Sequence, residues 1–415
     1  MTGCAQAIVC PEIAPSKKHS LNPVYWLALG TFAVGTEGFM IAGLLPTIAS
    51  SLAIKTSQAG LLVTIFSLAY AISSPLLTTA LAAVNRRHLL IASLGAFSVA
   101  NGVAAYSHNF WTLAGARVLL ALAAGLYVPG ANALASAIAT PERRGRALAI
   151  VNSGITLAVA IGVPLGALVG NRLGWRATFV AVAILSALAT IALKSGLPQG
   201  IGSGLKTPTW GERLDLIRQP SILRALSTTA VWAIGAYTLY TYLSPFLQHT
   251  TALSATGISA MLFVLGASAF GGVTIGGRMS DRFGPGAVTP RALATLTLIF
   301  VILSLFAHFL PSRLAVLPIA IAIIGWGLSG WSFFPAQQAS LIGLSGINVA
   351  PVALSLNASF MYVGFSIGAA IGSMTLTSAG VANLGFVAAV FELVALGMTL
   401  LSIRQSARSA RPVTS

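Results

Sequence analysis

The sequence predicts an all-α integral membrane protein, with twelve transmembrane helices in two pseudo-symmetric six-helix bundles. Of its 415 residues, 56% are apolar and 7% are charged, and the mean hydropathy is +0.89. In soluble domains roughly a quarter of all residues are charged, so this composition excludes a soluble domain. A bilayer requires about 20 apolar residues per helical span, and the chain divides into such stretches at short polar joints. One joint is long, and six apolar stretches lie on each side of it.

Each predicted span is an apolar run that ends where polar residues, glycine or proline interrupt it. In the first half the predicted spans are 24–49, 58–80, 89–107, 110–139, 146–170 and 176–194. In the second half they are 224–250, 256–276, 290–310, 314–342, 352–378 and 386–403.

The distribution of basic residues predicts the orientation of the chain. With the N-terminus inside, eighteen Lys and Arg residues fall on the cytoplasmic side, four fall on the outer side, and Arg117 alone lies within a span. Cytoplasmic joints carry an excess of Lys and Arg, so both termini are predicted to be cytoplasmic. This placement explains the net charge of +16 without nucleic acid as a partner. We expect a multi-pass protein of the cell (inner or plasma) membrane.

The single long connection divides the chain into regions. We predict an N-terminal tail (1–21), a first bundle (22–194), a linker (195–223), a second bundle (224–403) and a C-terminal tail (404–415). Glycines recur at four-residue intervals at 162, 166 and 170, and again at 364, 368 and 372. Two related halves are typical of secondary transporters, although tight helix packing alone also explains such glycines.

The joint after the eighth span reads GGRMSDRFG. It resembles the loop motif of the major facilitator superfamily, which implies the fold of that family. Gly277, Asp281, Arg282 and Gly284 occupy the motif positions. We expect Gly277, Arg278, Asp281 and Arg282 to form a gate whose contacts differ between transport states. A static surface pair is the alternative for Asp281, and such pairs contribute under about 1 kcal/mol.

Further segments resemble one branch of the superfamily. The fifth span reads GVPLGALVG, which is similar to the antiporter motif of proton-exchanging exporters, with Gly162, Pro164 and Gly166 at its positions. The first span, GTEGFMIAGLLPTIASSL, resembles that of twelve-span drug-proton antiporters, in particular the sugar, arabinose, purine-ribonucleoside and chloramphenicol efflux permeases. The resemblance implies proton-coupled efflux by alternating access.

Glu37 and Arg117 are charged residues within predicted spans. At 1.5 Å per residue, Glu37 lies about 20 Å into the membrane. A charge facing lipid at a helix centre costs about 2.5–3.5 kcal/mol, so both residues should face a partner or an aqueous cleft. Glu37 then carries a proton, anchors a cationic or hydroxylated substrate, or forms a permanent structural ion pair. Arg117 either tunes the protonation of Glu37 or orients helices through backbone carbonyls.

Glu392 is the other acid within a predicted span. The twelfth span is usually peripheral in the superfamily, which makes Glu392 a weaker candidate for proton coupling than Glu37. Its alternative is a side chain that snorkels to the membrane interface or faces lipid.

Aromatic and amide side chains on spans that flank the cavity in this family are the candidate substrate contacts. With Glu37, the predicted set is Tyr237, Tyr240, Trp331, Gln337, Asn357 and Tyr362. Sparse polar groups among aromatics suit an amphiphilic ligand. Helix packing and interfacial anchoring are the alternative roles of the aromatic residues.

Other functional classes lack their sequence signals. The five histidines are scattered at span ends, so no catalytic or metal-binding cluster is indicated, and no Walker A motif indicates ATP hydrolysis. No selectivity loop or charged ring indicates a channel. We therefore predict a monomeric proton-coupled exporter without a cofactor, whose partners are protons, a small molecule and the bilayer. A facilitator or proton-coupled importer on the same fold is the alternative.

Overall fold

The computed structural model describes residues 22–140, 143–199, 209–346 and 349–409. The predicted N-terminal tail, part of the linker and the last residues of the C-terminal tail lie outside these ranges. Within them, twelve helices are long and apolar enough to cross a membrane. The predicted fold class and number of spans are confirmed.

The first six spans run up and down through the membrane. They comprise α1 (Asn22–Ser51), α2 (Thr56–Ala80), α3 (Arg86–Ala105), α4 (Phe110–Ile138), a fifth span made of α5 (Arg144–Leu157), η2 (Ala158–Gly162) and α6 (Val163–Leu173), and α7 (Trp175–Gly196).

A short helix, α8 (Trp210–Ile217), precedes the second set of spans. These comprise α9 (Pro220–Tyr240), which is followed by the short α10 (Leu243–Thr250), then α11 (Ala255–Phe283), α12 (Pro285–Phe309), α13 (Val316–Ser345), α14 (Ala350–Ser378) and finally η3 (Val381–Asn383) with α15 (Leu384–Ser409).

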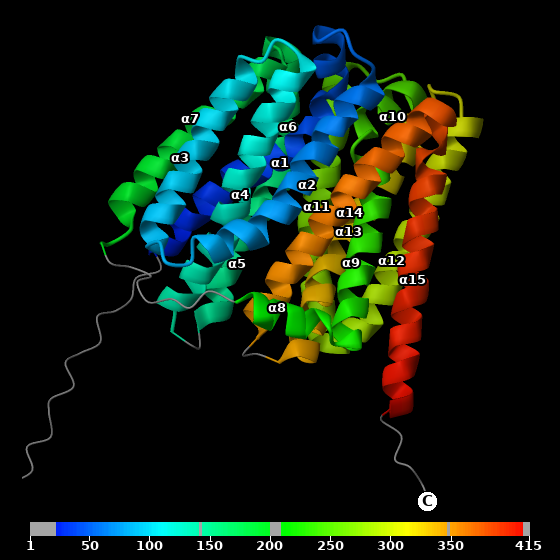
Figure 1. Ribbon diagram of the computed structural model, residues 1–415. Coiled ribbons are helices and arrows are strands. Elements are labelled where there is room, and N and C mark those ends of the chain that lie inside the picture. The colour runs from blue at the N-terminus through cyan, green and yellow to red at the C-terminus, as the bar shows by residue number, and fades with distance from the viewer. Residues whose placement is uncertain (1–21, 141–142, 200–208, 347–348, 410–415) are drawn as a thin grey trace, which may run out of the picture.

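Helices α1–α7 pack with one another on one side of the molecule, and α9–α15 on the other (Figure 1). The described part of α1 begins, and α15 ends, at the lower end of Figure 1, which we call the termini end. The opposite end is the distal end. Two seams join the halves: α2 packs against α14, and η2 with α6 packs against α11. The α5 part of the fifth span, nearer the termini end, adds little to the second seam.

The prediction of one continuous seventh span over 224–250 is wrong. The helix begins at Pro220, ends at Tyr240 and resumes at Leu243. Pro245 explains the break, because it has no backbone N–H to donate to the carbonyl of Thr241 four residues earlier. The residue before a proline is also disfavoured in helical conformation. The short α10 is therefore free to turn away from the direction of α9.

The linker contains α8, whose first turn is fixed by a capping box. The backbone N–H of Glu212 donates to the Thr209 hydroxyl, and the backbone N–H of Thr209 donates to the Glu212 carboxylate. This cap places Arg213 between the two halves, where its guanidinium donates to the hydroxyl oxygens of Thr78 on α2 and Ser355 on α14, both at 3.4 Å. Burial lowers the pKa of the Arg213 guanidinium.

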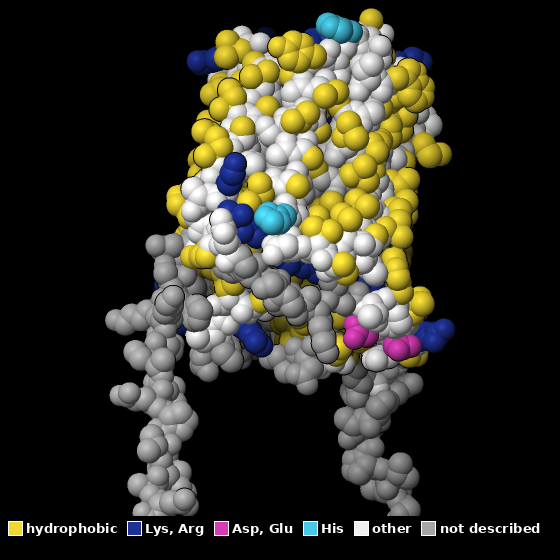
Figure 2. Space-filling view, turned by 60° about the vertical axis from the view of Figure 1, so that its left-hand side comes forward, with side chains coloured by type: hydrophobic (Ala, Val, Ile, Leu, Met, Phe, Trp, Pro, Cys, Tyr) yellow, Lys and Arg dark blue, Asp and Glu magenta, His cyan; other side chains and the backbone are white. Residues whose placement is uncertain are grey.

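The outer surface is that of a membrane protein. On the face shown in Figure 2, hydrophobic side chains run along the spans, and the acidic side chains in view lie at the lower end. Large apolar side chains such as Leu68, Ile72, Leu188 and Leu298 are exposed on the spans. In a bilayer these side chains contact lipid, so their exposure carries no hydrophobic cost.

Candidate functional site

Glu37 and Arg117 form a buried ion pair in the middle of the first half. Nη1 of Arg117, on α4, donates to Oε1 of Glu37, on α1. Both side chains are fully buried, with 0% of their surface exposed. Removing two charges from water costs several kcal/mol per ion, and their mutual attraction offsets this cost only when the geometry is good. Neither charge faces the surface of the protein, as the sequence predicts.

Arg117 makes two further contacts with α2. Its Nε donates to the backbone carbonyl of Leu62 at 3.4 Å, and its guanidinium lies 4.2 Å from the centre of the Phe66 ring. Oε2 of Glu37 and Nη2 of Arg117 have no hydrogen-bond partner among the described residues. Each member of the pair therefore has an unused hydrogen-bonding position directed into the protein.

The turn of α1 that carries Glu37 packs closely on the fifth span. A Cβ added at Gly162 would overlap the Thr36 side chain, and one added at Gly35 would lie 2.9 Å from the Ala158 methyl group. These contacts fall on η2, where the Val163 N–H bonds to the Ala158 carbonyl five residues earlier. Single π-helical turns within α-helices are frequent at functional sites.

The predicted antiporter motif thus lies on this wide turn and just beyond it. Gly162 is the last residue of η2, and Pro164 lies in the first turn of α6. A Cβ at Gly166 would lie 3.2 Å from both Met40 and Thr178. On its other side, η2 touches α11 of the second half, where a Cβ at Gly266 would overlap the Val159 carbonyl oxygen. The motif therefore lies between Glu37 and the other half of the protein.

Phe39, two residues after Glu37, contacts three of the predicted aromatic residues. Its ring centre lies 6.4 Å from that of Tyr237, 6.3 Å from Tyr240 and 6.2 Å from Trp331. The Tyr240 hydroxyl donates to the Phe39 carbonyl oxygen at 3.1 Å. Because Phe39 belongs to the first half and the other three to the second, this cluster lies between the halves.

A second aromatic contact crosses the α2–α14 seam. The rings of Tyr70 and Tyr362 stack at 3.8 Å between centres, and Phe66 lies 6.5 Å from Tyr362. Phe365, one turn from Tyr362, stacks on Tyr237 at 3.5 Å. The predicted residues Tyr237, Tyr240, Trp331 and Tyr362 are thus brought together, and aromatic rings fill the space between them.

Gln337 and Asn357 lie apart from this cluster, within the second half. Nε2 of Gln337 donates to the backbone carbonyl of Ala225 at 2.7 Å, and the Thr229 hydroxyl donates to Oδ1 of Asn357 at 2.7 Å. Both side chains are buried. In this state they hold α13 and α14 against α9.

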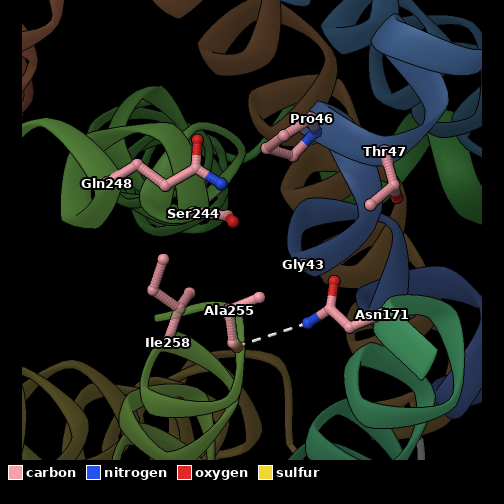
Figure 3. A pocket seen from close by; sticks show the side chains of 8 residues that line it. All are labelled: Gly43, Pro46, Thr47, Asn171, Ser244, Gln248, Ala255 and Ile258. Atoms are coloured by element: carbon pink, nitrogen blue, oxygen red, sulfur yellow. Dashed lines mark hydrogen bonds between the residues drawn. The ribbon is translucent and has the colours of Figure 1, made fainter. Parts of the chain in front are cut away.

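Polar contacts close the distal end of the interface. Nδ2 of Asn171, on α6, donates to the Ala255 carbonyl at 3.3 Å and to the Ser259 hydroxyl at 3.1 Å, both on α11. Figure 3 shows Asn171 reaching Ala255 across a small gap that Ser244 and Gln248 of α10 also line. At the distal end of the α2–α14 seam, the Ser373 hydroxyl donates to the Ser57 carbonyl at 3.0 Å.

At the termini end, Arg213 makes a contact that crosses between the halves. The predicted gate residues Arg278, Asp281 and Arg282 lie in the last turns of α11 and are exposed. Among the described residues Asp281 forms no ion pair, and a Cβ at Gly277 would meet open space. Their contacts in another transport state stay a prediction.

Glu392 does not reach the membrane interface. It lies within α15 with 0% of its surface exposed, and its carboxylate faces Gly235 on α9. The alternative of a snorkelling or lipid-facing side chain is therefore wrong for this state. The reason is the lack of a side chain at Gly235, which leaves room for a carboxyl group between the two helices.

Several contact residues did not emerge from the sequence. The aromatic cluster is completed by Phe39, Phe66, Tyr70 and Phe365. No periodic pattern in the sequence distinguishes these aromatic residues from the other apolar residues of their spans. Arg213 lies in a short linker helix and resembles any other basic residue of that segment. The capping box that positions it, Thr209 to Glu212, is a readable signal.

A helical membrane protein with two packed halves, a buried ion pair and a polar closure at one end has the construction of an alternating-access transporter. The chain belongs to the Major Facilitator Superfamily, whose family model matches residues 27–347. It is therefore a secondary transporter of a small molecule, and not an enzyme, as the sequence predicts.

Curated relatives cover nearly the whole chain. The chain is 32% identical over 387 residues to the uncharacterized MFS-type transporter YbcL of Bacillus subtilis (strain 168), covering 93% of this chain and 97% of YbcL. It is 31% identical over 387 residues to the inner membrane transport protein YdhP of Escherichia coli (strain K12), covering 93% and 96%. It is also 35% identical over 298 residues to a chloramphenicol resistance protein of Streptomyces lividans, covering 67% and 76%.

Solved structures support the fold. A bacterial homologue of the human lysosomal transporter Spinster, solved in an inward-facing and unoccupied conformation, superposes with a TM-score of 0.78 at 18% identity, covering 94% of this chain and 98% of that one. The human organic anion transporter MFSD10 (TETRAN) gives a TM-score of 0.69 at 17% identity, covering 93% and 100%. At these identities the likeness concerns the fold alone.

Proposed function

We propose that this transporter exchanges protons for a small amphiphilic organic molecule, which it exports by alternating access. The observation that carries the proposal is the fully buried Glu37–Arg117 pair on a turn of α1 that also touches the second half. Ionisable residues within a membrane are costly and usually functional, and proton relays are among their common roles.

The proton acts on this pair. In the proposed cycle, the ionised form of Glu37 is the one that binds Arg117. Protonation of Glu37 removes its charge and leaves Arg117 buried without a counterion, which costs about 3–5 kcal/mol for a buried pair. The protein lowers this cost by moving α1 relative to α4, so that Arg117 reaches water or another acceptor. Protonation is thereby linked to a change in helix packing.

The same turn transmits the movement to the second seam and to the aromatic cluster between the halves. Thr36 packs against Gly162 of η2, and Phe39 contacts Tyr240 and Trp331 of the second half. A small shift of α1 therefore disturbs the second seam indirectly, through η2. It disturbs the aromatic cluster directly, through Phe39. Packed interfaces of this kind tend to have two discrete arrangements, so they convert a small shift into a switch.

The aromatic cluster suggests the class of substrate. Tyr70, Tyr237, Trp331 and Tyr362 offer flat faces and a few hydroxyl groups near the buried pair. A molecule with a ring and one or two hydrogen-bonding groups can replace these ring–ring contacts when the halves separate. The similarity to a chloramphenicol resistance protein supports such a substrate. We assign the chain to the drug-proton antiporter branch on this basis.

We place both termini in the cytoplasm and the protein in the inner membrane as a monomer. The orientation rests on the excess of Lys and Arg at the termini end, and the location on the name of YdhP. The termini end is then the cytoplasmic end. The residues that we propose form the gate at this cytoplasmic end are Gly277, Arg278, Asp281 and Arg282, together with Arg213.

The test is substrate transport in proteoliposomes with an imposed pH gradient. Amphenicols, nucleosides, sugars and lipophilic cations are screened first by thermal shift of the purified protein. Glu37→Gln keeps the shape of the side chain and removes its titration, so gradient-driven accumulation should disappear while substrate binding persists. Accumulation at the wild-type rate in Glu37→Gln would exclude Glu37 as the proton carrier.

Asp215→Asn is the matched control, because this carboxylate is 74% exposed and, among the described residues, pairs only with Arg218 at the surface. It should transport like the wild type. Loss of substrate binding together with transport in Glu37→Gln would instead assign Glu37 to the substrate. Wild-type transport that equilibrates the substrate but ignores the pH gradient would identify a facilitator.

A further inference from the structure

Glu392 is a second buried carboxyl group, which the proposed mechanism does not use. It lies in the interior of α15 with 0% of its surface exposed. Neither Oε1 nor Oε2 has a hydrogen-bond partner, and Glu392 forms no ion pair with any described residue. An unpaired carboxylate in a dry interior is strongly destabilised, so the group persists there only when it carries a proton.

Its surroundings offer no charge that could replace that proton. The helices packed on α15 are α9, α12 and α14, with η3 at its distal end. Their titratable side chains are bonded or stacked elsewhere: Arg224 to the Pro220 carbonyl, Arg291 to the Ala287 carbonyl, His308 to the Ser304 carbonyl, Tyr237 on Phe365, Tyr240 to the Phe39 carbonyl and Tyr362 on Tyr70. None of them contacts Glu392.

The carboxyl group occupies a space that Gly235 leaves open. A Cβ at Gly235 would lie 2.7 Å from Oε1 and 3.1 Å from Cδ of Glu392. Any larger residue at position 235 would displace either the carboxyl group or α9. The burial of Glu392 therefore depends on close contact between α9 and α15.

Glu392 lies against a residue of α9 whose position along its helix matches that of Glu37 along α1. Glu37 lies fifteen residues after Asn22, the first described residue of α1, and Gly235 lies fifteen residues after Pro220, where α9 begins. Both helices run from the termini end to the distal end, and each of these two residues lies about 22 Å along its helix. Gly235 also precedes Tyr237 of the aromatic cluster by two residues.

We propose that Glu392 is a second proton-binding site, which holds its proton while α9 and α15 are in contact and releases it when they separate. The ligand is a proton, and binding converts the carboxylate to a neutral carboxylic acid without any other reactant. Separation of α9 from α15 admits water to the carboxyl group, and the ionised form is then stabilised by hydration. The site belongs to the second half alone and does not require that Glu37 carry a proton.

Isotope-edited infrared spectroscopy tests this assignment directly. The full-length protein is labelled with carboxyl-¹³C glutamate and purified at neutral pH in a detergent without ester groups. The chain has only seven Asp and Glu residues, so a carbonyl band of a protonated glutamic acid can be assigned by substitution. We expect this band in the wild type and in Glu37→Gln, and its loss in Glu392→Gln.

The absence of the band from the wild type would overturn the proposal even if Glu392→Gln did not fold. Its loss in Glu37→Gln with retention in Glu392→Gln would also overturn it, because the proton would then reside on Glu37. The readout needs no transport, so its failure is distinct from failure of the proposed exchange.

Two glycine variants test the dependence on α9. Gly235→Ala pushes α9 away from the carboxyl group and should weaken the band at neutral pH. Gly397→Ala on α15 is the matched control, because a Cβ there would meet nothing within 4 Å, and it should leave the band unchanged. An unchanged band in a folded Gly235→Ala variant would overturn the dependence on α9.

Discussion

The hydroxyl of Tyr240 donates a hydrogen bond of 3.1 Å to the backbone carbonyl of Phe39, and this bond connects the second half of the protein to the turn of the first half that carries Glu37. It is one of the few direct bonds at the centre of the interface. Its position two residues from Glu37 makes it a sensitive reporter of the contact between the halves.

Tyr240→Phe removes this bond and keeps the ring. A hydrogen bond contributes about 1 kcal/mol, so the equilibrium between the closed and separated arrangements should shift about five-fold toward separation. Distances between spin labels across the distal end would measure the shift. Tyr127→Phe is the control, because its hydroxyl bonds to the Leu27 carbonyl within the first half, and the populations of the two arrangements should not change.

The Glu37–Arg117 pair should show strong coupling in thermal unfolding. Glu37→Gln and Arg117→Gln each leave one buried charge or polar group without its partner, and each should lower the stability by about 3–5 kcal/mol. The double variant removes both charges and should lose less than the sum of the two. Additive losses in this double-mutant cycle would contradict a direct pair.

Arg213→Ala should release the contact between α2 and α14 at the termini end. The variant loses the bonds to Thr78 and Ser355, so a cysteine placed near Ser355 should react faster with a soluble thiol reagent. Both native cysteines lie before residue 22 and can be replaced beforehand. Arg218→Ala is the control, because Arg218 is 78% exposed and its one ion pair within the described ranges is with Asp215. Equal reaction rates in both variants would argue against a bridge.

Gly162→Ala should disturb the packing of η2 on α1. The added methyl group overlaps the Thr36 side chain, and overpacking of this kind costs about 1–3 kcal/mol. Thermal stability and transport should both fall. Gly145→Ala in the same span adds its methyl group in open space and should change neither.

Asp281→Asn should slow turnover and leave substrate binding intact. Asp281 is exposed and unpaired among the described residues, so the stability of this state should change by less than about 0.5 kcal/mol. Substrate binding by titration and transport rates in proteoliposomes separate the two effects. A loss of binding with normal folding would contradict a gating role.

The sequence was sufficient for the number of spans and for the bounds of most of them, because the bilayer imposes their length and composition. It also indicated that Glu37 and Arg117 are buried charges, because few other charged residues lie within the predicted spans. It could not show that they pair, because they lie 80 residues apart and their contact depends on the packing of α1 on α4.

The remaining features depend on tertiary contacts. The π-helical turn η2 and the break after Tyr240 are each set by a proline together with the surrounding packing. The stack of Tyr70 on Tyr362 joins helices almost 300 residues apart in sequence. Glu392 illustrates the limit of prediction from sequence. Its burial depends on Gly235 of another helix and not on its neighbours in the sequence.

Three of the bonds between the halves share one property. Tyr240 donates to the Phe39 carbonyl, Ser366 to the Thr64 carbonyl and Ser373 to the Ser57 carbonyl. These acceptors are helix backbone oxygens that can also accept a bond from their own helix. When the halves part, each oxygen keeps a partner and each hydroxyl can turn to water. These three bonds can therefore break and re-form without leaving their polar atoms unsatisfied, which is what repeated cycles of transport require.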